Sequence, residues 1–159
     1  MQTPDAFDRK ILSELQRNGR LSIAELSERV GLSASPCWRR VRMLEEAGVI
    51  RGYTALVDPA ALGLGLNVFV AATIDLHRAA EFEAAIMKRP EVLECFAMTG
   101  DQDYLLHVIT ADIEAFDRFL REDLIHMPGV DKVKSSFALK AIKSTSSLPV
   151  DVASRSEIP

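Results

Sequence analysis

The stretch SASPCWRRVRMLEEAGVIRGY, residues 33–53, places three arginines and the only tryptophan of the chain within its first ten residues. Pro36 falls where a first helical turn would lie, and Gly48 follows the last helix-forming residue. Proline is tolerated in a first turn, and glycine is common just past a helix end. The spacing therefore predicts a helix that begins at Ser33 or Ser35 and ends before Gly48.

The arginines of this helix are predicted to lie mainly on its exposed face. At about 100° per residue, Cys37, Val41 and Leu44 share a narrow arc, which we expect to be buried. The side chains that project from the opposite side are those of Ser35, Arg39, Arg42 and Glu46. Trp38 stands on one flank, and Arg40 stands near the buried edge.

A face of this kind suits the major groove of DNA. Arginine donates two hydrogen bonds to the edge of a guanine, and serine reaches bases or phosphates. The residues that we predict to contact DNA are Ser33, Ser35, Pro36, Trp38, Arg39, Arg40 and Arg42. The alternative is an ordinary amphipathic helix whose arginines pair with Glu45 and Glu46 in water.

Two shorter helices are predicted before this one. Residues 4–18 carry apolar side chains at helical spacing, and Asn18-Gly19 ends the pattern. Residues 22–31 follow, with Ser22 and Glu25 as an S-x-x-E capping box and Gly31 at the end. Three short helices with a glycine turn between the second and third have the spacing of a helix-turn-helix unit.

The distribution of charge also favours DNA binding by the first third of the chain. The whole chain has 159 residues and a net charge of −4. Residues 1–52 hold nine Lys and Arg against seven Asp and Glu, whereas residues 53–159 hold ten against sixteen. A polyanion is therefore expected to bind the front part rather than the acidic remainder.

Beyond residue 65 the spacing of apolar residues changes. Alternating patterns predict strands over residues 66–76, 92–99, 104–110 and 130–143. Helical patterns cover residues 79–89 and 112–124. The second of these helices is expected to bury Ile113, Phe116, Leu120 and Leu124 on one stripe. The order β-α-β-β-α-β is that of the ferredoxin-like split βαβ motif, so the chain is predicted to be α+β.

These patterns divide the chain into four parts. We expect a helix-turn-helix domain at residues 1–52, an extended linker at 53–65, a ferredoxin-like domain at 66–143 and a flexible tail at 144–159. Phe69 and Phe137 are candidates for burial against a partner subunit, although the chain's own helices are an equal alternative.

The composition excludes several classes of protein. No run approaches the ~18 apolar residues of a membrane span, and the N-terminus lacks the pattern of a signal peptide. Cys37 and Cys95 are far apart, so neither a disulfide framework nor a zinc site is expected. His77, His107 and His126 have no metal-ligand spacing, and we expect structural or solvated roles for them. We therefore predict a cytoplasmic protein without a metal or cofactor.

Residues 8–53 resemble the DNA-binding domain of the Lrp/AsnC (feast/famine) transcription regulators. The runs SASPCWRRV and LEEAGVIRGYTA, residues 33–41 and 44–55, carry the resemblance. The later runs TGDQDYLL and MPGV, residues 99–106 and 127–130, match the effector domain of that family in the same order. The resemblance covers roughly residues 5–143. It implies a winged-type helix-turn-helix domain joined to a βαββαβ domain called RAM.

The resemblance also implies a site for a small amino-acid effector. Asp103 is then the partner of the ammonium group, and the pocket is shaped by Gly100, Asp101, Tyr104 and Leu105. Ser135 and Ser136 would come from a neighbouring subunit, and Ile113 would contact the effector side chain. The alternative for residues 100–103 is a plain β-turn, because Gly-Asp-x-Asp is ordinary turn chemistry.

The function implied is a regulator that binds double-stranded DNA at a palindromic operator and responds to an amino acid. It would act as a homodimer that assembles further, with an octamer as the expected form, and it would bind no membrane. Two alternatives stay open. One is an enzyme similar to siroheme decarboxylases, which resemble the same two-domain fold, and the other is an architectural protein that compacts DNA.

Overall fold

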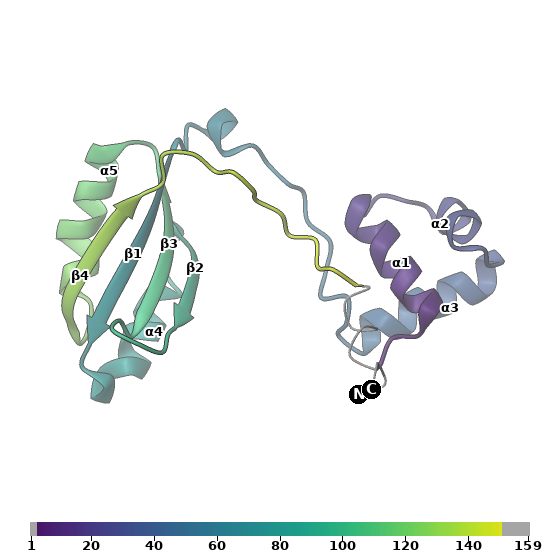
Figure 1. The fold of residues 1–159 in the computed structure, drawn as a ribbon, viewed down its shortest axis with the longest axis horizontal. Helices are drawn as coiled ribbons and strands as arrows, with labels where there is room; N and C mark the ends of the chain where they lie inside the picture. Colours follow the sequence, from purple (N-terminus) through teal and green to yellow (C-terminus); the bar gives the residue numbers. More distant parts are fainter. Residues whose placement is uncertain (1–2, 151–159) are drawn as a thin grey trace. The chain divides into compact units, whose positions relative to one another are not determined.

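The computed structural model describes residues 3–150, which form two compact units. The first unit comprises residues 3–56 together with residues 144–150, and the second comprises residues 57–143 (Figure 1). The chain therefore passes from one unit to the other twice.

Three helices build the first unit: α1 (Ala6–Arg17), α2 (Ile23–Val30) and α3 (Ala34–Glu46). The capping box predicted at α2 is present, since Ser22 accepts from the backbone of Glu25 and the Glu25 side chain accepts from Ser22. Gly31 ends α2 with a φ of 77°, a conformation that favours glycine. The predicted helix-turn-helix spacing is confirmed.

The core of this unit is made by all three helices. Its buried side chains are Ile11, Leu26, Val30, Cys37, Val41 and Leu44. Within the linker predicted at residues 53–65, residues 53–58 form neither helix nor strand, and Pro59–Leu62 make a short 3₁₀ turn.

The tail was expected to be flexible, and the described part of it contacts α1. The side-chain amide of Gln16 donates to the carbonyl of Leu148 at 3.0 Å and accepts from its N–H at 2.6 Å. Residues 151–159 lie outside the described residues, so the flexibility of the tail as a whole stays a prediction.

The second unit is a four-stranded antiparallel sheet with helices on one face (Figure 1). The strands are β1 (Leu66–Ile74), β2 (Val92–Ala97), β3 (Tyr104–Thr110) and β4 (Val130–Phe137). Their order across the sheet is β2-β3-β1-β4, which is the predicted ferredoxin-like arrangement. The last strand is shorter than predicted, because pairing with β1 ends at Phe137.

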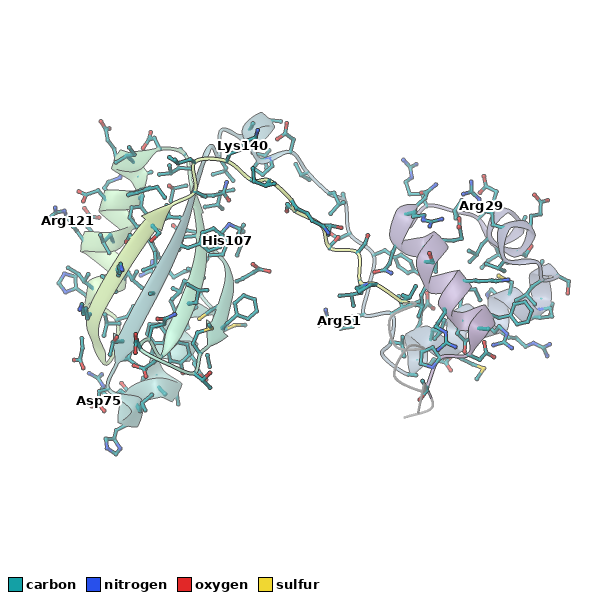
Figure 2. All side chains as sticks on the ribbon, viewed as in Figure 1. Arg29, Arg51, Asp75, His107, Arg121 and Lys140 are labelled. Carbon is teal, nitrogen blue, oxygen red and sulfur yellow. The ribbon has the colours of Figure 1, made fainter. Side chains whose placement is uncertain are left out.

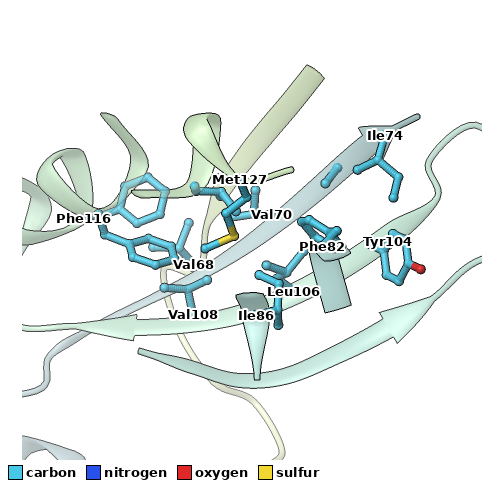
Figure 3. Close-up of a cluster of buried hydrophobic side chains, with 13 residues drawn as sticks. Val68, Val70, Ile74, Phe82, Ile86, Tyr104, Leu106, Val108, Phe116 and Met127 are labelled. Carbon is cyan, nitrogen blue, oxygen red and sulfur yellow. The ribbon is translucent and has the colours of Figure 1, made fainter. Parts of the chain in front are cut away.

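The core of the second unit lies between the sheet and the helices (Figure 3). Alternate residues of β1, Val68, Val70, Ala72 and Ile74, are buried as predicted. Helix α4 (Ala79–Ile86) contributes Phe82 and Ile86 to the same cluster. Helix α5 (Ile113–Arg118) contributes Phe116, and the turns that follow it contribute Phe119 and Leu124.

The predicted apolar stripe of residues 112–124 was partly wrong. Ile113 is 64% exposed, and Phe119, which the stripe omitted, is buried. Ile113 is the first residue of α5, one turn before Phe116 enters the core. A π-helical turn at Phe119–Asp123 follows α5 and leads into a 3₁₀ turn at Leu124–His126. A π turn holds more residues than an α turn, which allows Phe119 and Leu124, five residues apart, both to face the core.

No helix within residues 3–150 has the length and apolar character needed to cross a membrane.

The burial of Phe119 and the exposure of Ile113 predict unequal effects on stability for two substitutions. Phe119→Ala should lower the free energy of unfolding by about 3–5 kcal/mol, because it leaves a cavity in the core. Ile113→Ala should change it by less than about 0.5 kcal/mol, because the side chain is mostly in water. Denaturant titration of both variants checks this, and equal effects of the two substitutions would contradict it.

Candidate functional site

Helix α3 is held against the other helices by the face that the sequence predicted. Cys37, Val41 and Leu44 are 0%, 7% and 6% exposed and pack in the three-helix core. The side chains on the opposite face, those of Ser35, Arg39, Arg42 and Glu46, are all exposed. The rotation of α3 about its axis therefore presents the predicted polar face to water.

The leading end of α3 is free of negative charge. No acidic residue lies in its first turn, and the side chain of Ser33 at the N-cap makes no capping hydrogen bond. The N–H groups at a helix start carry a partial positive charge and favour anions. This end of α3, with its serine hydroxyls, can therefore approach a phosphate without acidic side chains in its way.

The three arginines of α3 have three different environments. Arg39 makes no ion pair with any residue in the described part of the chain. Arg42 pairs with Glu46 at 3.2 Å and lies 3.9 Å from Glu45, which are exposed pairs of low stability. Arg39 is thus ready to contact a ligand, whereas Arg42 must first leave its glutamates.

Arg40 connects α3 to the start of α1. Its guanidinium donates to Asp5 and to Asp8 at 2.7 Å each and lies 5.5 Å from the centre of the Phe7 ring. The same two aspartates form the capping box of α1. The N–H of Asp8 and the charge of Arg40 lower the pKa of the Asp5 carboxyl, and the two carboxylates raise the pKa of Arg40. To contact DNA, the Arg40 guanidinium would have to leave Asp5 or Asp8. Its contact with DNA stays a prediction.

The second predicted site is the turn between β2 and β3. Gly100 there has a φ of 124°, which a residue with a side chain rarely adopts. Asp103 is fixed by three hydrogen bonds. Its N–H donates to Ala72, its carbonyl accepts from Met98, and Oδ2 of its carboxylate accepts from the N–H of Ile74 at 2.8 Å. Oδ1 of Asp103 makes no hydrogen bond with residues 3–150, so it can accept from a ligand.

Tyr104 lies beneath this turn rather than in it. The ring is 5% exposed and packs against Phe82, with 4.9 Å between the ring centres. Its hydroxyl donates to Glu83 of α4 at 2.6 Å, which raises the pKa of Tyr104 to about 12. Leu105 points to the other face of the sheet because successive residues of a strand alternate. Tyr104 therefore supports the turn from the core side.

The remaining predicted effector residues are not brought together within one chain. Ser136 pairs with Phe69 on the sheet face that lacks helices, whereas Ser135 pairs with Val70 on the face that the helices cover. Ile113 follows the end of β3, whereas Asp103 precedes its start. A hollow of about 470 Å³ lies beside Ile113, lined also by Gly65 and Leu66. A site containing all of these residues would need more than one subunit.

Sequence reasoning missed three supporting residues. Glu83 holds Tyr104, and Asp5 and Asp8 hold Arg40. The D-x-x-D spacing of Asp5 and Asp8 is a capping signal that could have been found, whereas Glu83 carries no comparable signal.

Within residues 3–150, no histidine side chain hydrogen-bonds to a predicted residue of either site. His107, labelled in Figure 2, faces Asn67 at 2.9 Å and Glu94 at 3.4 Å and stacks on Phe69. Among the described residues, no three His, Cys, Asp or Glu side chains are grouped to hold a metal.

Each of the two units matches a family of known protein domains. Residues 67–148 match the family described as Lrp/AsnC ligand binding domain, and residues 4–51 match winged helix-turn-helix DNA-binding. The leucine-responsive regulatory protein of Salmonella typhimurium is 44% identical over 151 residues, which cover 92% of this chain and 91% of that protein. The DNA-binding transcriptional activator DecR of Escherichia coli is 40% identical, over 92% of this chain and 99% of its own.

Solved structures of transcription regulators resemble this chain over most of its length. A transcriptional regulator of Neisseria meningitidis in complex with L-Met is 48% identical, with a TM-score of 0.90 over 92% of this chain and 97% of its own. An AsnC family regulator of Agrobacterium tumefaciens is 41% identical, with a TM-score of 0.88 over the same shares of the two chains.

The ion pairs of Arg40 predict a pH-dependent stability of the first unit. The pKa of Asp5 is lower in the folded state than its unfolded value of ~3.9. The contribution of Asp5 to the free energy of unfolding is therefore fully present above that unfolded pKa, and it is lost as the pH falls through the folded-state pKa. Arg40→Ala should cost about 1–2 kcal/mol at pH 7 and weaken this acid dependence. Thermal unfolding followed by Trp38 fluorescence measures the stability of the variant and its dependence on pH. Arg39→Ala is the matched control, and equal stability of the two variants would contradict the role of Arg40.

Proposed function

Because this chain belongs to the Lrp/AsnC family of transcription regulators, we propose that it binds a palindromic operator as a dimer or larger assembly and responds to a small amino acid. The observation that carries the DNA-binding proposal is the exposed face of α3, with Arg39 unpaired in the described chain and an acid-free first turn. The mechanism follows from the chemistry of that face.

Base contacts come from the middle of the exposed face. Arg39 and Arg42 donate to guanine edges in the major groove, and Ser35 contacts a neighbouring base. Ser33 and the start of α3 contact phosphates, and Trp38, which is 51% exposed, lies against the backbone of the duplex. Each phosphate contact releases counterions, so binding weakens steeply as salt rises.

The uncovered face of the sheet is the proposed dimer surface. Both helices pack on one face, and the other face bears large apolar side chains, with Phe69 at 40% and Phe96 at 51% exposed. Phe137 does not belong to this surface, because it packs on Phe116 of the helical face. Burying Phe69 and Phe96 against a second copy removes apolar surface from water and brings two DNA-binding units into one particle.

The turn at Gly100–Asp103 is the proposed effector site. Oδ1 of Asp103 accepts from the ammonium group of an amino acid, and N–H groups of the turn donate to its carboxylate. Asp101 and Leu105 border the site, and Ser136 of the partner subunit contributes a hydroxyl. The relative from Neisseria meningitidis was solved with L-Met, which is a precedent for an amino-acid ligand in this fold.

Regulation of transcription is favoured over the two alternatives. The relatives are named as regulators, one of them as a leucine-responsive protein and another as a DNA-binding activator. An enzyme acting on a haem precursor would show a Soret band with bound tetrapyrrole. An architectural protein would bind random DNA as strongly as its own upstream region. Two free cysteines fit the reducing cytoplasm, which we keep as the expected compartment.

Arg39→Ala should weaken binding to the operator by about 1–3 kcal/mol and relax the preference at one base pair, because a bidentate contact is lost. Selection from a random duplex library followed by fluorescence anisotropy measures both effects. Arg17→Ala, which removes an exposed charge from α1, should leave the sequence preference unchanged. Wild-type affinity and preference in Arg39→Ala would overturn the assignment of α3 to the groove.

Asp103→Asn should weaken effector binding by about 1.5–3 kcal/mol while operator affinity without effector stays nearly unchanged. Asparagine keeps an oxygen that can accept from Ile74, so the turn should hold its shape while the charge is lost. A thermal-shift screen of the twenty amino acids identifies the ligand, because a ligand that binds only the folded state raises the melting temperature. Equal calorimetric affinity in the variant would exclude Asp103 as the ammonium partner.

Phe69→Glu should dissociate the dimer, because it places two charges in the proposed apolar interface. Losing the burial of one phenylalanine per subunit corresponds to a dimerisation constant weaker by at least about tenfold. Sedimentation velocity measures the mass, and circular dichroism checks the fold. Leu76→Glu, a substitution at a 65% exposed leucine outside the sheet, should leave the mass unchanged. If Phe69→Glu sediments like the wild type, the dimer uses another surface.

A further inference from the structure

Met43 lies on the same exposed face of α3 as the arginines predicted to contact DNA. Residues four apart on an α-helix are neighbours on its surface, and Met43 follows Arg39 by four residues. Its side chain is 61% exposed and takes no part in the three-helix core of the described chain. An apolar side chain therefore lies beside Arg39 on the surface that we assign to the DNA groove.

The polar row of α3 has one exposed apolar side chain on each flank. At about 100° per residue, Trp38 and Met43 are about 140° apart around the helix axis. The residues that project between these two are Ser35, Arg39, Arg42 and Glu46. The proposed function places Trp38 against the backbone of the duplex and gives Met43, on the other flank, no partner.

The chemistry of methionine selects one group of the major groove. The side chain is unbranched and ends in a polarisable thioether, which donates no hydrogen bond. It therefore cannot read the polar edge of a base in the way that arginine or asparagine does. The apolar group that base pairs present in the major groove is the 5-methyl group of thymine, and cytosine lacks it. A single exposed methionine is ordinary on a protein surface, but this one lies where such a methyl group would come.

Met43 is also close enough to Arg39 for the two side chains to contact neighbouring base pairs. Their Cα atoms lie about 6 Å apart along the helix axis, because the rise is about 1.5 Å per residue. A helical side chain leans towards the N-terminus, so that of Met43 leans towards Arg39. Successive base pairs of DNA are about 3.4 Å apart. The two side chains therefore match adjacent positions of one half-site.

We propose that Met43 is a specificity-determining residue, which contacts the 5-methyl group of a thymine next to the base pair that Arg39 reads. The thioether side chain packs on that methyl group, and both lose their contact with water. This inference rests on the proposed function, because it needs α3 in the major groove. It adds a preference for T·A over C·G that depends on an apolar contact rather than on a hydrogen bond.

Replacing thymine by deoxyuridine in the operator tests this contact with the full-length protein. Deoxyuridine still pairs with adenine and keeps the O4 acceptor, so the replacement removes only the methyl group. In the operator selected by the wild type, each thymine is replaced in turn together with its symmetry mate. At one thymine of each half-site, beside the base pair whose preference depends on Arg39, affinity should fall roughly fourfold per half-site, the loss expected for one buried methyl group. Fluorescence anisotropy measures it.

Three variants assign the methyl group to its contact. Met43→Ala should bind the thymine and deoxyuridine duplexes with equal affinity, whereas Met43→Leu, which keeps an apolar side chain, should retain the preference for thymine. Met87→Ala removes an 85% exposed methionine from the second unit and should also retain that preference. An effect of deoxyuridine on the shape of the DNA would persist in Met43→Ala, so this variant separates a contact from a change of shape.

The outcomes separate this proposal from the proposed function. The role of Met43 is overturned if the selected operator has no thymine beside the Arg39-dependent base pair, if no deoxyuridine replacement weakens binding, or if Met43→Ala keeps the full loss. A wild type that selects an operator and depends on Arg39, yet gives one of these results, keeps α3 in the groove and loses only the contact of Met43. A wild type that selects no sequence overturns both proposals.

Discussion

The packing of α3 against α1 and α2 is the contact on which the DNA-binding surface depends. Cys37, Val41 and Leu44 are each buried in the core that the three helices form. Because side chains in a core are closely packed, α3 cannot rotate about its axis without breaking these contacts. The far face is thereby determined, and Arg39 is exposed as a geometric consequence. Arg40 adds a second restraint at the edge of this contact through Asp5 and Asp8.

The sheet imposes a similar rule on the second unit. Neighbouring residues of a strand point to opposite faces, so Tyr104 enters the core while Leu105 faces the uncovered side. The proposed effector turn therefore has the hydrogen bond of Tyr104 to Glu83 below it and the proposed subunit interface beside it.

Most of the fold could be predicted from local signals. The S-x-x-E box at Ser22 predicts the start of α2, and Gly31 predicts its end. The alternation along β1 predicts a strand with one buried face. All three predictions agree with the structure. The burial of both Phe119 and Leu124 could not be predicted, because the π turn between them has no simple sequence signature. The partners of Arg40 and Tyr104 depend on pairing between distant segments, which periodicity does not reveal. The opposite faces of Ser135 and Ser136, by contrast, follow from the alternation of a strand.

The complete burial of Cys37 has a consequence for redox chemistry. Burial raises the pKa of its thiol, and only the thiolate reacts readily with oxidants or alkylating reagents. The sulfur also lies on the inner side of α3, so a reagent reaches it only when the three helices separate. The folded protein therefore protects this cysteine from mild oxidation, and the rate of its alkylation reports how often that core opens.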